Sequence, residues 1–328
     1  MTRALAVSFA VVVSVSAVSA GAQTPPVSAP PVPQPEIRGV IAAGTTVQLI
    51  KDGFQGTEGP VATPNGELYF TDPYASKMYK MDKAGNVTLW REDTGGTSGI
   101  FLLKDGRLLA AETGRHRLVA IDPDGKLTPL VTVGVGGRAL RLTNDMIVDK
   151  KGGIYFTDPA PFAFAGQPPP TEMPPGFVYY LPPKGNLILI DDQIARPNGI
   201  SLTFDGKILF IADTDSENLW AFDVQPDGTA KNRRSFVKLH EPQARPDGTF
   251  SSRADGMAMD TEGRLYVTTS SGVQVIDSRG QYLGTIRTPK NPSNLAFGGP
   301  DRRTLYITGR DSLFSVKMLS QGPADRAK

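Results

Sequence analysis

The sequence of 328 residues contains no cysteine and only two histidines. The missing cysteines exclude disulfide bonds and a lipid anchor attached at a cysteine. The formal charge is only +2 and no run of lysines and arginines occurs, so we expect no nucleic acid partner. Long amphipathic helical patterns are not evident. Glycine (35 residues) and proline (28 residues) are abundant instead, as in folds with many tight turns.

The first 22 residues have the pattern of a secretory signal peptide. Arg3 supplies a positive charge, residues 4–18 form a short apolar stretch, and Ala20-Gly21-Ala22 fits cleavage after Ala22. The alternative is an uncleaved membrane anchor, but the stretch is short and rich in alanine, serine and valine rather than leucine. We therefore expect an exported protein, periplasmic or secreted, that keeps no membrane attachment after cleavage.

A proline-rich segment follows the predicted cleavage site. Prolines occupy positions 25, 26, 30, 31, 33 and 35. Such spacing predicts an extended, polyproline-type linker. We assign residues 23–44 to this linker and expect no core within it.

One unit recurs six times along the rest of the chain. Two copies are nearly identical, Gly66–Asp72 (GELYFTD) and Gly152–Asp158 (GGIYFTD), and weaker copies begin at residues 106, 206, 263 and 302. Each copy begins with a turn and continues as a β-rich run, which is typical of a strand that leaves a hairpin.

Each copy combines with flanking strand-like runs into a unit of four strands. Units of about forty to fifty residues built in this way predict the blades of a propeller. We expect an all-β, six-bladed β-propeller with four antiparallel strands per blade over residues 45–318, and a flexible tail over 319–328. The sixth unit lacks its last strand. Thr46–Ile50 can supply it, so an N-terminal strand is predicted to close the last blade.

A polar residue lies eight positions before each of the six turn positions. In a propeller the first strand of every blade runs beside the central axis, so residues at one shared register lie at one height around the channel. These residues are Glu58, Ser98, Asn144, Asn198, Asp255 and Asn294.

Four members of this set, Glu58, Asn144, Asn198 and Asp255, are candidate metal ligands. Carboxylate and amide oxygens suit Ca²⁺, Mg²⁺ or Mn²⁺ better than soft metals. Two carboxylates would also balance the charge of a divalent ion in a channel of low dielectric. Taken singly, each residue is more often a turn former than a ligand. The shared register favours the metal site over six unrelated turns.

The segments around these positions resemble the SMP-30/gluconolactonase/LRE-like family, over about residues 45–317. The resemblance rests on Glu58-Gly59-Pro60, Asn144-Asp145-Met146, residues 196–200 (RPNGI), Asp255-Gly256-Met257 and residues 294–299 (NLAFGG). It implies a six-bladed propeller that hydrolyses sugar lactones or, in some branches, other lactones or organophosphates.

The resemblance also implies roles for individual residues. Glu58, Asn198 and Asp255 would bind the metal, and Asn144 would be a fourth ligand or a substrate contact. Asp255 would act as the catalytic acid and base as well. The family metal is Ca²⁺ or Zn²⁺, and the oxygen-only ligand set favours Ca²⁺. Ser98, Arg141 and Asn294 are further candidates for substrate contacts.

One feature departs from the related paraoxonases, which use a pair of channel histidines. The only histidines here, His116 and His240, fall in a hairpin and at the start of a loop, so we expect surface positions for both.

The long loops 160–176 and 239–252 are candidate lids. Phe162 or Phe164 would line an apolar wall, and Arg245 or Arg253 would meet substrate oxygens. Plain solvent-exposed connections are the alternative.

Together these features predict a metal-dependent hydrolase that opens a lactone ring. Asp255 would take the proton of a metal-activated water, or would attack the substrate directly. Two alternatives stay open, namely a non-catalytic propeller that binds a ligand or a protein, and an organophosphate or aryl-ester hydrolase on the same metal. We expect a small lactone or ester as the partner and a monomer or weak oligomer.

Overall fold

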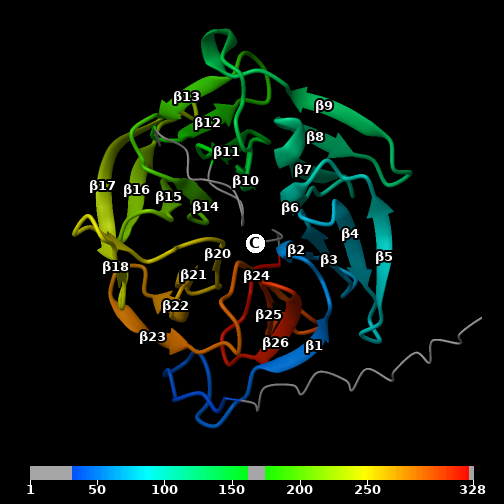
Figure 1. Ribbon diagram of the computed structural model, residues 1–328, viewed down its shortest axis with the longest axis vertical. Coiled ribbons are helices and arrows are strands. Elements are labelled where there is room, and N and C mark those ends of the chain that lie inside the picture. Colours follow the sequence, from blue (N-terminus) through cyan, green and yellow to red (C-terminus); the bar gives the residue numbers. More distant parts are fainter. Residues whose placement is uncertain (1–31, 162–173, 325–328) are drawn as a thin grey trace, which may run out of the picture. The chain divides into compact units, whose positions relative to one another are not determined.

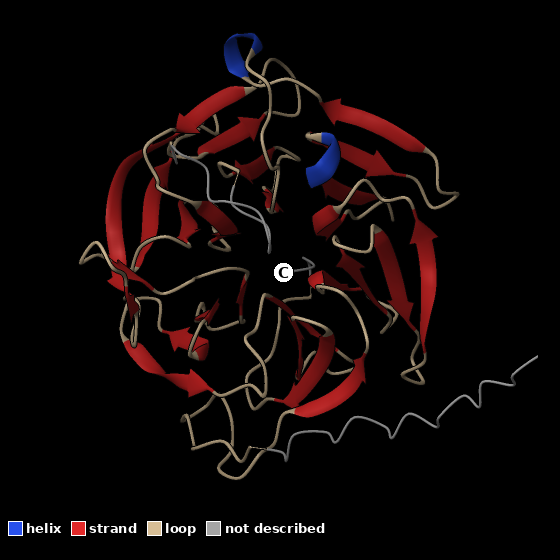
Figure 2. Ribbon diagram, in the orientation of Figure 1, coloured by secondary structure: helices blue, strands red, loops and turns tan. Residues whose placement is uncertain are grey.

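The computed structural model describes residues 32–161 and 174–324. The predicted signal peptide, Phe162 and Phe164 lie outside these residues. Six four-stranded antiparallel sheets are arranged around one axis (Figure 1). Helix within the described ranges is limited to two 3-10 turns, η1 (Thr113–Arg115) and η2 (Val135–Gly137), as Figure 2 shows. None of the helices described is long and apolar enough to cross a bilayer. The prediction of an all-β, six-bladed propeller is therefore confirmed.

The strands of each blade are given below in order from the one beside the axis to the one at the rim (Figure 1). Blade one holds β2 (Glu58–Ala62), β3 (Leu68–Asp72), β4 (Lys77–Met81) and β5 (Val87–Glu92). Blade two holds β6 (Thr97–Leu102), β7 (Leu108–Glu112), β8 (Arg117–Ile121) and β9 (Leu127–Val131). Blade three holds β10 (Met146–Val148), β11 (Ile154–Asp158), β12 (Phe177–Leu181) and β13 (Ile188–Asp191).

The remaining blades follow the same order. Blade four holds β14 (Pro197–Leu202), β15 (Ile208–Asp213), β16 (Asn218–Val224) and β17 (Ala230–Lys238). A short hairpin of β18 (Gln243–Ala244) and β19 (Phe250–Ser251) separates it from blade five. Blade five holds β20 (Met257–Met259), β21 (Leu265–Thr269), β22 (Gly272–Ile276) and β23 (Tyr282–Ile286). Blade six holds β24 (Asn294–Gly298), β25 (Thr304–Gly309), β26 (Ser312–Lys317) and β1 (Gln48–Asp52).

The N-terminal strand closes the last blade. Strand β1 pairs with β26 antiparallel, with Gln48 opposite Ser315, and the sheet order is β1-β26-β25-β24. The strand was expected at Thr46–Ile50 and begins two residues later. Because strands from both ends of the domain pair in one sheet, no open edge is left between the first and the last blade.

The recurring turn position between the first two strands of each blade requires a left-handed backbone. Its φ is 88° at Gly66 and 89° at Gly152, and it stays positive, at 53°, where the sixth blade has Arg302. Glycine adopts this conformation without a steric penalty, whereas other L-residues do so at a cost. This explains why five of the six repeats keep the glycine.

The core fills the sheets and the seams between neighbouring blades. The largest cluster joins blades two, three and four and includes Tyr155, Phe156, Tyr179 and Tyr180, all of them buried. Tyr155 and Tyr180 stack with ring centroids 4.4 Å apart. Packed seams of this kind hold the inner strands, and therefore the residues at their ends, in fixed positions.

The predicted linker and tail are shorter than the sequence indicated. Ile37, Val40 and Ile41 are buried among side chains of blades five and six, and the amide of Leu319 donates to the Val40 carbonyl at 2.8 Å. Ser320 is buried as well. The expectation that the linker has no core up to residue 44 is wrong for Ile37, Val40 and Ile41, and the predicted tail is hydrogen-bonded to the propeller at Leu319 and Ser320. Ile37, Val40 and Ile41 carried the signal, but the prolines before them and Arg38 and Gly39 between them obscured it.

Candidate functional site

The six residues of the predicted register lie at equivalent places in the six blades. Glu58 and Asn294 begin their inner strands, and Ser98 and Asn198 are the second residues of theirs. Asn144 and Asp255 lie two residues before β10 and β20. Each inner strand therefore presents its polar residue at the same end of the channel.

Glycines bring successive members of this set into contact. Gly59, Gly99, Gly199 and Gly256 each follow one member, and a Cβ on any of them would lie closer than 3.0 Å to the next member. The atoms met are the backbone oxygens of Ser98, Asn144 and Asp255 and the side chain of Asn294. The glycines are thus required by the close approach of neighbouring blades.

Hydroxyl groups link the blades at the same level. Each hydroxyl donates to a backbone carbonyl of the next blade, and the six bonds form a complete circle. They are Thr71 to Ser98 (2.7 Å), Thr113 to Thr143 (2.7 Å), Thr157 to Asn198 (2.7 Å), Thr214 to Ala254 (2.7 Å), Thr268 to Ser293 (2.9 Å) and Ser293 to Thr57 (2.6 Å). Hence the six register positions form one closed ring, which we call the polar ring.

Negative charge gathers in the polar ring. The pKa of Asp255 is raised well above its usual range, first by burial and then by the charges of Glu58 and Asp145. The Arg310 guanidinium and a hydrogen bond from Asn198 act in the opposite direction. A cation at this place would relieve the repulsion between the carboxylates.

The donor set fits a hard cation. Oδ1 of Asn198 is buried and has no hydrogen-bond partner among the residues described, while its Nδ2 donates to Thr214 at 3.0 Å. An unpartnered buried carbonyl oxygen is costly unless a ligand satisfies it. Over the described ranges, no three side chains of His, Cys, Asp or Glu lie close enough together to hold a metal. Binding would therefore need amide oxygens beside the two carboxylates.

The remaining ring residues have other contacts. Nδ2 of Asn294 donates to the Glu58 carboxylate at 3.3 Å, and Oδ1 of Asn294 accepts from the Leu295 amide. Asn294 therefore orients Glu58. Ser98 is buried, and its carbonyl accepts the hydroxyl of Thr71. Whether Ser98 and Asn294 also contact a substrate stays a prediction.

Arg141 packs on Phe177, the first residue of β12. Its guanidinium lies 4.3 Å from the centroid of the Phe177 ring and donates to the Pro175 carbonyl at 2.8 Å. These contacts hold the beginning of β12 in place. A role for Arg141 as a substrate contact stays a prediction.

In three blades, an aspartate at the end of the second strand accepts a hydrogen bond from the backbone segment that leads to the ring residue. Asp72 accepts the amide of Gly56, Asp158 that of Arg141 and Asp213 that of Arg196. Burial raises the pKa of Asp158 to about 6. The repeated Thr-Asp pair of the heptapeptide thus has two functions: its threonine bonds to the next blade and its aspartate supports its own.

Three further residues lie near the ring, and none of them was predicted from the sequence. Asp145 is fully buried, and its charge acts on Asp255. The sequence does contain a signal for Asp145, because this carboxylate stands at the position where four other blades have glycine. Tyr74 and Arg310 lie on turns of blades one and six. Burial and the charges of Glu58 and Asp255 raise the pKa of Tyr74, and the charge of Arg310 opposes the rise in the pKa of Asp255. No sequence pattern indicated that these two turns lie beside the ring.

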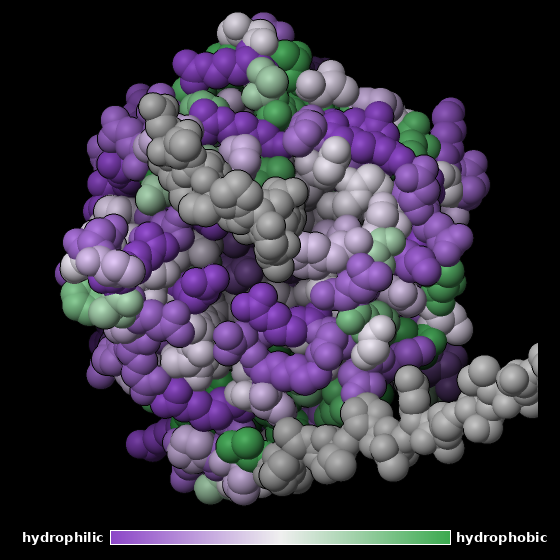
Figure 3. All heavy atoms as spheres, viewed as in Figure 1, coloured by the Kyte–Doolittle hydropathy of each residue, from purple (hydrophilic) through white to green (hydrophobic). Residues whose placement is uncertain are grey.

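Arginines gather where blades four and five meet. Nε of Arg196 lies 3.0 Å from the Asp215 carboxylate, which also pairs with Arg245 from the β18–β19 hairpin. Burial and the neighbouring Arg245 and Arg253 lower the pKa of Arg196. The face that carries this hairpin is hollowed at its centre and has many hydrophilic side chains around the hollow (Figure 3).

The two histidines lie outside the ring, as expected. His116 is exposed in a left-handed turn, and its Nδ1 contacts the Arg141 carbonyl. His240 stacks on Tyr282 with ring centroids 3.8 Å apart.

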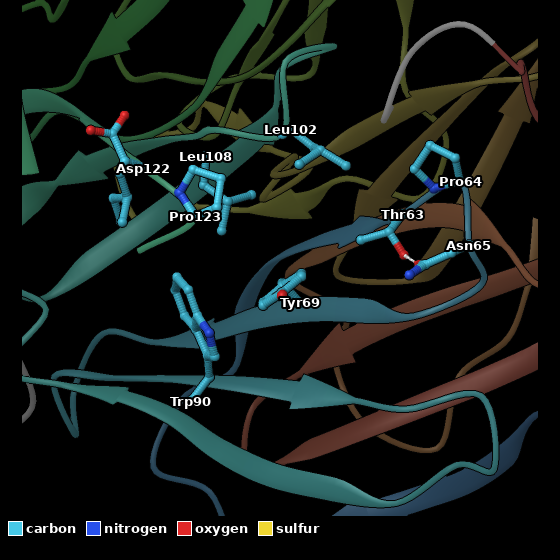
Figure 4. A pocket seen from close by; sticks show the side chains of 11 residues that line it. Thr63, Pro64, Asn65, Tyr69, Trp90, Leu102, Leu108, Asp122 and Pro123 are labelled. Atoms are coloured by element: carbon cyan, nitrogen blue, oxygen red, sulfur yellow. Dashed lines mark hydrogen bonds between the residues drawn. The ribbon is translucent and has the colours of Figure 1, made fainter. Parts of the chain in front are cut away.

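A separate cavity of about 320 Å³ lies at the turn end of blades one and two (Figure 4). Tyr69 and Trp90 pack edge to face on one side of it, and Pro64 and Pro123 lie at its rim. No member of the polar ring lines it. It is therefore distinct from the candidate site.

Comparison with known proteins agrees with this architecture. The sequence pattern of the family described as SMP-30/Gluconolactonase/LRE-like region matches residues 56–310 of this chain. A gluconolactonase of Zymomonas mobilis is 28% identical over 311 residues, which cover 88% of this chain and 85% of the relative. The diisopropyl-fluorophosphatase of Loligo vulgaris is 29% identical over 290 residues, which cover 80% and 88% of the two chains.

Among solved structures, a gluconolactonase from Xanthomonas campestris superposes with a TM-score of 0.75 at 29% identity, over 88% of this chain and 95% of that chain. The family match begins just before Glu58 and ends just after β25, so it includes every member of the polar ring. On this evidence the chain belongs to the SMP-30/gluconolactonase/LRE-like family.

Proposed function

We propose that this protein is a metal-dependent lactonase whose reaction takes place at the polar ring. One observation carries the proposal. The carboxylates of Glu58 and Asp255 and the unpartnered buried Oδ1 of Asn198 meet at one end of the channel. The similarity to two gluconolactonases supports the class of reaction.

Glu58, Asn198 and Asp255 would hold the cation, with Asn144 as a fourth ligand or a substrate contact. Oxygen ligands favour Ca²⁺, and Zn²⁺, Mg²⁺ or Mn²⁺ are the alternatives. Such an ion polarises an ester carbonyl and makes a bound water more acidic.

Asp255 would move the proton. A carboxylate oxygen of Asp255 accepts a proton from the attacking water and later delivers it to the ring oxygen of the lactone as that bond breaks. Asn294 fixes the Glu58 carboxylate through its 3.3 Å hydrogen bond. Direct attack of Asp255 on the carbonyl is the other route. On that route the ring C–O bond breaks to give an anhydride with Asp255, and water then attacks the Asp255 carboxyl carbon. A single turnover in ¹⁸O-water distinguishes the routes, because this hydrolysis places the label in Asp255 rather than in the product.

The test combines elemental analysis of the purified protein with rates on a panel of lactones. We expect one divalent ion per chain, loss of activity after chelation, and recovery when Ca²⁺ is restored. Asp255→Asn should lower kcat by at least about 100-fold. The control is Asp277→Asn, because Asp277 lies in the hairpin between β22 and β23. Full activity after complete removal of metal, or a near wild-type rate for Asp255→Asn, would refute the mechanism.

A second candidate function uses the same ring. The similarity to diisopropyl-fluorophosphatase favours hydrolysis of organophosphates or aryl esters as the alternative. It predicts a higher kcat/KM for those esters than for every lactone of the panel. A protein that binds metal but hydrolyses neither class would be a non-catalytic binding propeller.

We also propose that the protein is exported, on the basis of its first 22 residues. Mass spectrometry of the secreted or periplasmic product should give Gln23 as the first residue. An intact N-terminus in the cell extract would contradict export.

A further inference from the structure

The arginines near the polar ring differ in how their charge is compensated. Arg196 lies two residues before Asn198, and Arg253 lies two residues before Asp255, at the same register of neighbouring blades. Two residues of chain span no more than about 7 Å. The Cα atoms of both arginines therefore lie within this distance of the ring residues that follow them.

The acids of this region contact groups other than Arg253. Asp215 alone pairs with both Arg196 and Arg245. Asp213 uses Oδ1 for the amides of Arg196 and Asp215, and Oδ2 for Ser216 and Trp220. Asp247, in the same hairpin as Arg245, accepts from Thr249, and the charge of Arg245 acts on it. Arg253 is exposed and forms no ion pair within the part of the chain that the structure describes. The Ser252 amide donates to the Ser216 carbonyl at 3.0 Å and the Thr214 amide donates to the Arg196 carbonyl at 3.0 Å, so the backbones at Arg253 and Arg196 lie against the same turn.

A further arginine lies beside the strand that begins at Glu58, because the Thr57 hydroxyl donates to the Arg310 carbonyl at 3.2 Å. Arg310, in the turn between β25 and β26, is exposed and has no ion pair among the described residues. Its neighbour Asp311 is paired with Lys290. The charge of Arg310 acts on both Asp255 and Tyr74. The ring is thus negative, whereas the wall beside it carries exposed guanidinium groups.

This separation of charge suits a substrate with two different ends. A neutral sugar lactone offers only hydroxyl groups to the wall, and these do not require unpaired arginines. A carboxylate or phosphate accepts two parallel hydrogen bonds from one guanidinium, and such bonds are stronger than neutral ones. An anionic group placed there leaves the carbonyl of the same molecule free to face the ring.

We propose that the substrate is a lactone that carries an anionic group, and that Arg253 and Arg310 bind this group. The inference rests on the proposed lactonase function and adds the substrate class to it. A carboxylate and a phosphate share the chemistry that the arginines recognise, and the test distinguishes them.

The experiment measures kcat/KM for three sugar lactones that differ only at the terminal carbon, which carries a hydroxyl, a carboxylate or a phosphate. Wild-type protein should prefer one anionic lactone over the neutral one by at least about tenfold. Arg253→Gln and Arg310→Gln should each lower this ratio by at least about threefold, and together they should abolish the preference. The preference should also weaken as salt is raised, because exposed charges are screened.

Arg279→Gln is the matched control, because Arg279 is an exposed arginine in the distant hairpin between β22 and β23. It should leave the ratio unchanged. The inference is wrong if wild-type protein hydrolyses the neutral lactone as well as both anionic ones, or if the variants lower all three rates equally. No hydrolysis of any lactone would instead refute the lactonase proposal itself.

Discussion

At the scale of single residues, the same side chain has different roles at equivalent positions of the polar ring. Asn198 keeps a buried Oδ1 without a partner among the described residues, whereas Asn294 uses both ends of its amide within the protein. The first arrangement is suited to a ligand and the second to a residue that orients a neighbour. The difference arises from which groups the adjacent blade supplies.

Asp158 should make stability depend on pH. Its pKa rises from 3.8 to about 6 on folding, so the folded protein holds a proton that the unfolded chain releases above pH 4. The stabilisation from this group is fully present below pH 4 and is lost as the pH rises through about 6. The loss amounts to about 3 kcal/mol at most.

Urea unfolding of wild type and Asp158→Asn at several pH values tests this prediction. The difference in free energy of unfolding, wild type minus variant, should fall between pH 4 and pH 7. Asp247→Asn is the control, because hydrogen bonds lower the pKa of Asp247 and its pH dependence has the opposite sign. A difference for Asp158→Asn that does not change with pH would contradict the assignment.

At the scale of elements, four of the six inner strands have a glycine after the ring residue, at a place that leaves no space for a side chain. A Cβ on Gly199 would overlap the backbone carbonyl of Asp255, and one on Gly256 would overlap Asn294. These contacts set the spacing of blades four, five and six at the ring. The hydroxyl bonds between blades then fix the register of one inner strand against the next.

Gly199→Ala should therefore destabilise the fold and disturb Asp255. Overpacking against a backbone atom costs about 3 kcal/mol. Gly248→Ala is the matched control, because Gly248 has positive φ (81°) but nothing within 4 Å of the added Cβ, so it carries backbone strain of about 1 kcal/mol without a clash. Urea unfolding compares the two. Equal losses would show that the close approach between blades is unimportant.

At the scale of the whole molecule, the two ends of the described chain complete the propeller together. Strand β1 supplies the outer strand of blade six, and residues 37–47 then fill the seam between blades five and six. The C-terminal segment bonds to the same region through Leu319 and Val40. Closure of the ring therefore depends on segments that lie almost a whole chain apart.

Removal of residues 1–44 should weaken the protein much more than removal of residues 1–31. The longer deletion loses the buried side chains of Ile37, Val40 and Ile41. Each contributes about 1.5–3 kcal/mol, so we expect a loss of about 5 kcal/mol in free energy of unfolding. The shorter deletion keeps these side chains and serves as the control. Equal stability of the two proteins would mean that this segment packs without contributing to the fold.

The sequence by itself determined the architecture. Six copies of a turn followed by β-rich runs fixed the number of blades, and a polar residue at one register of each copy indicated the ring, because a propeller places equal registers at equal height. The tertiary structure decided which groups surround that ring. Tyr74 and Arg310 lie near it because turns of blades one and six meet there, and no local pattern encodes that contact. The extent of the linker was decided in the same way, because the apolar residues at 37–41 acquire a core only when blades five and six lie side by side.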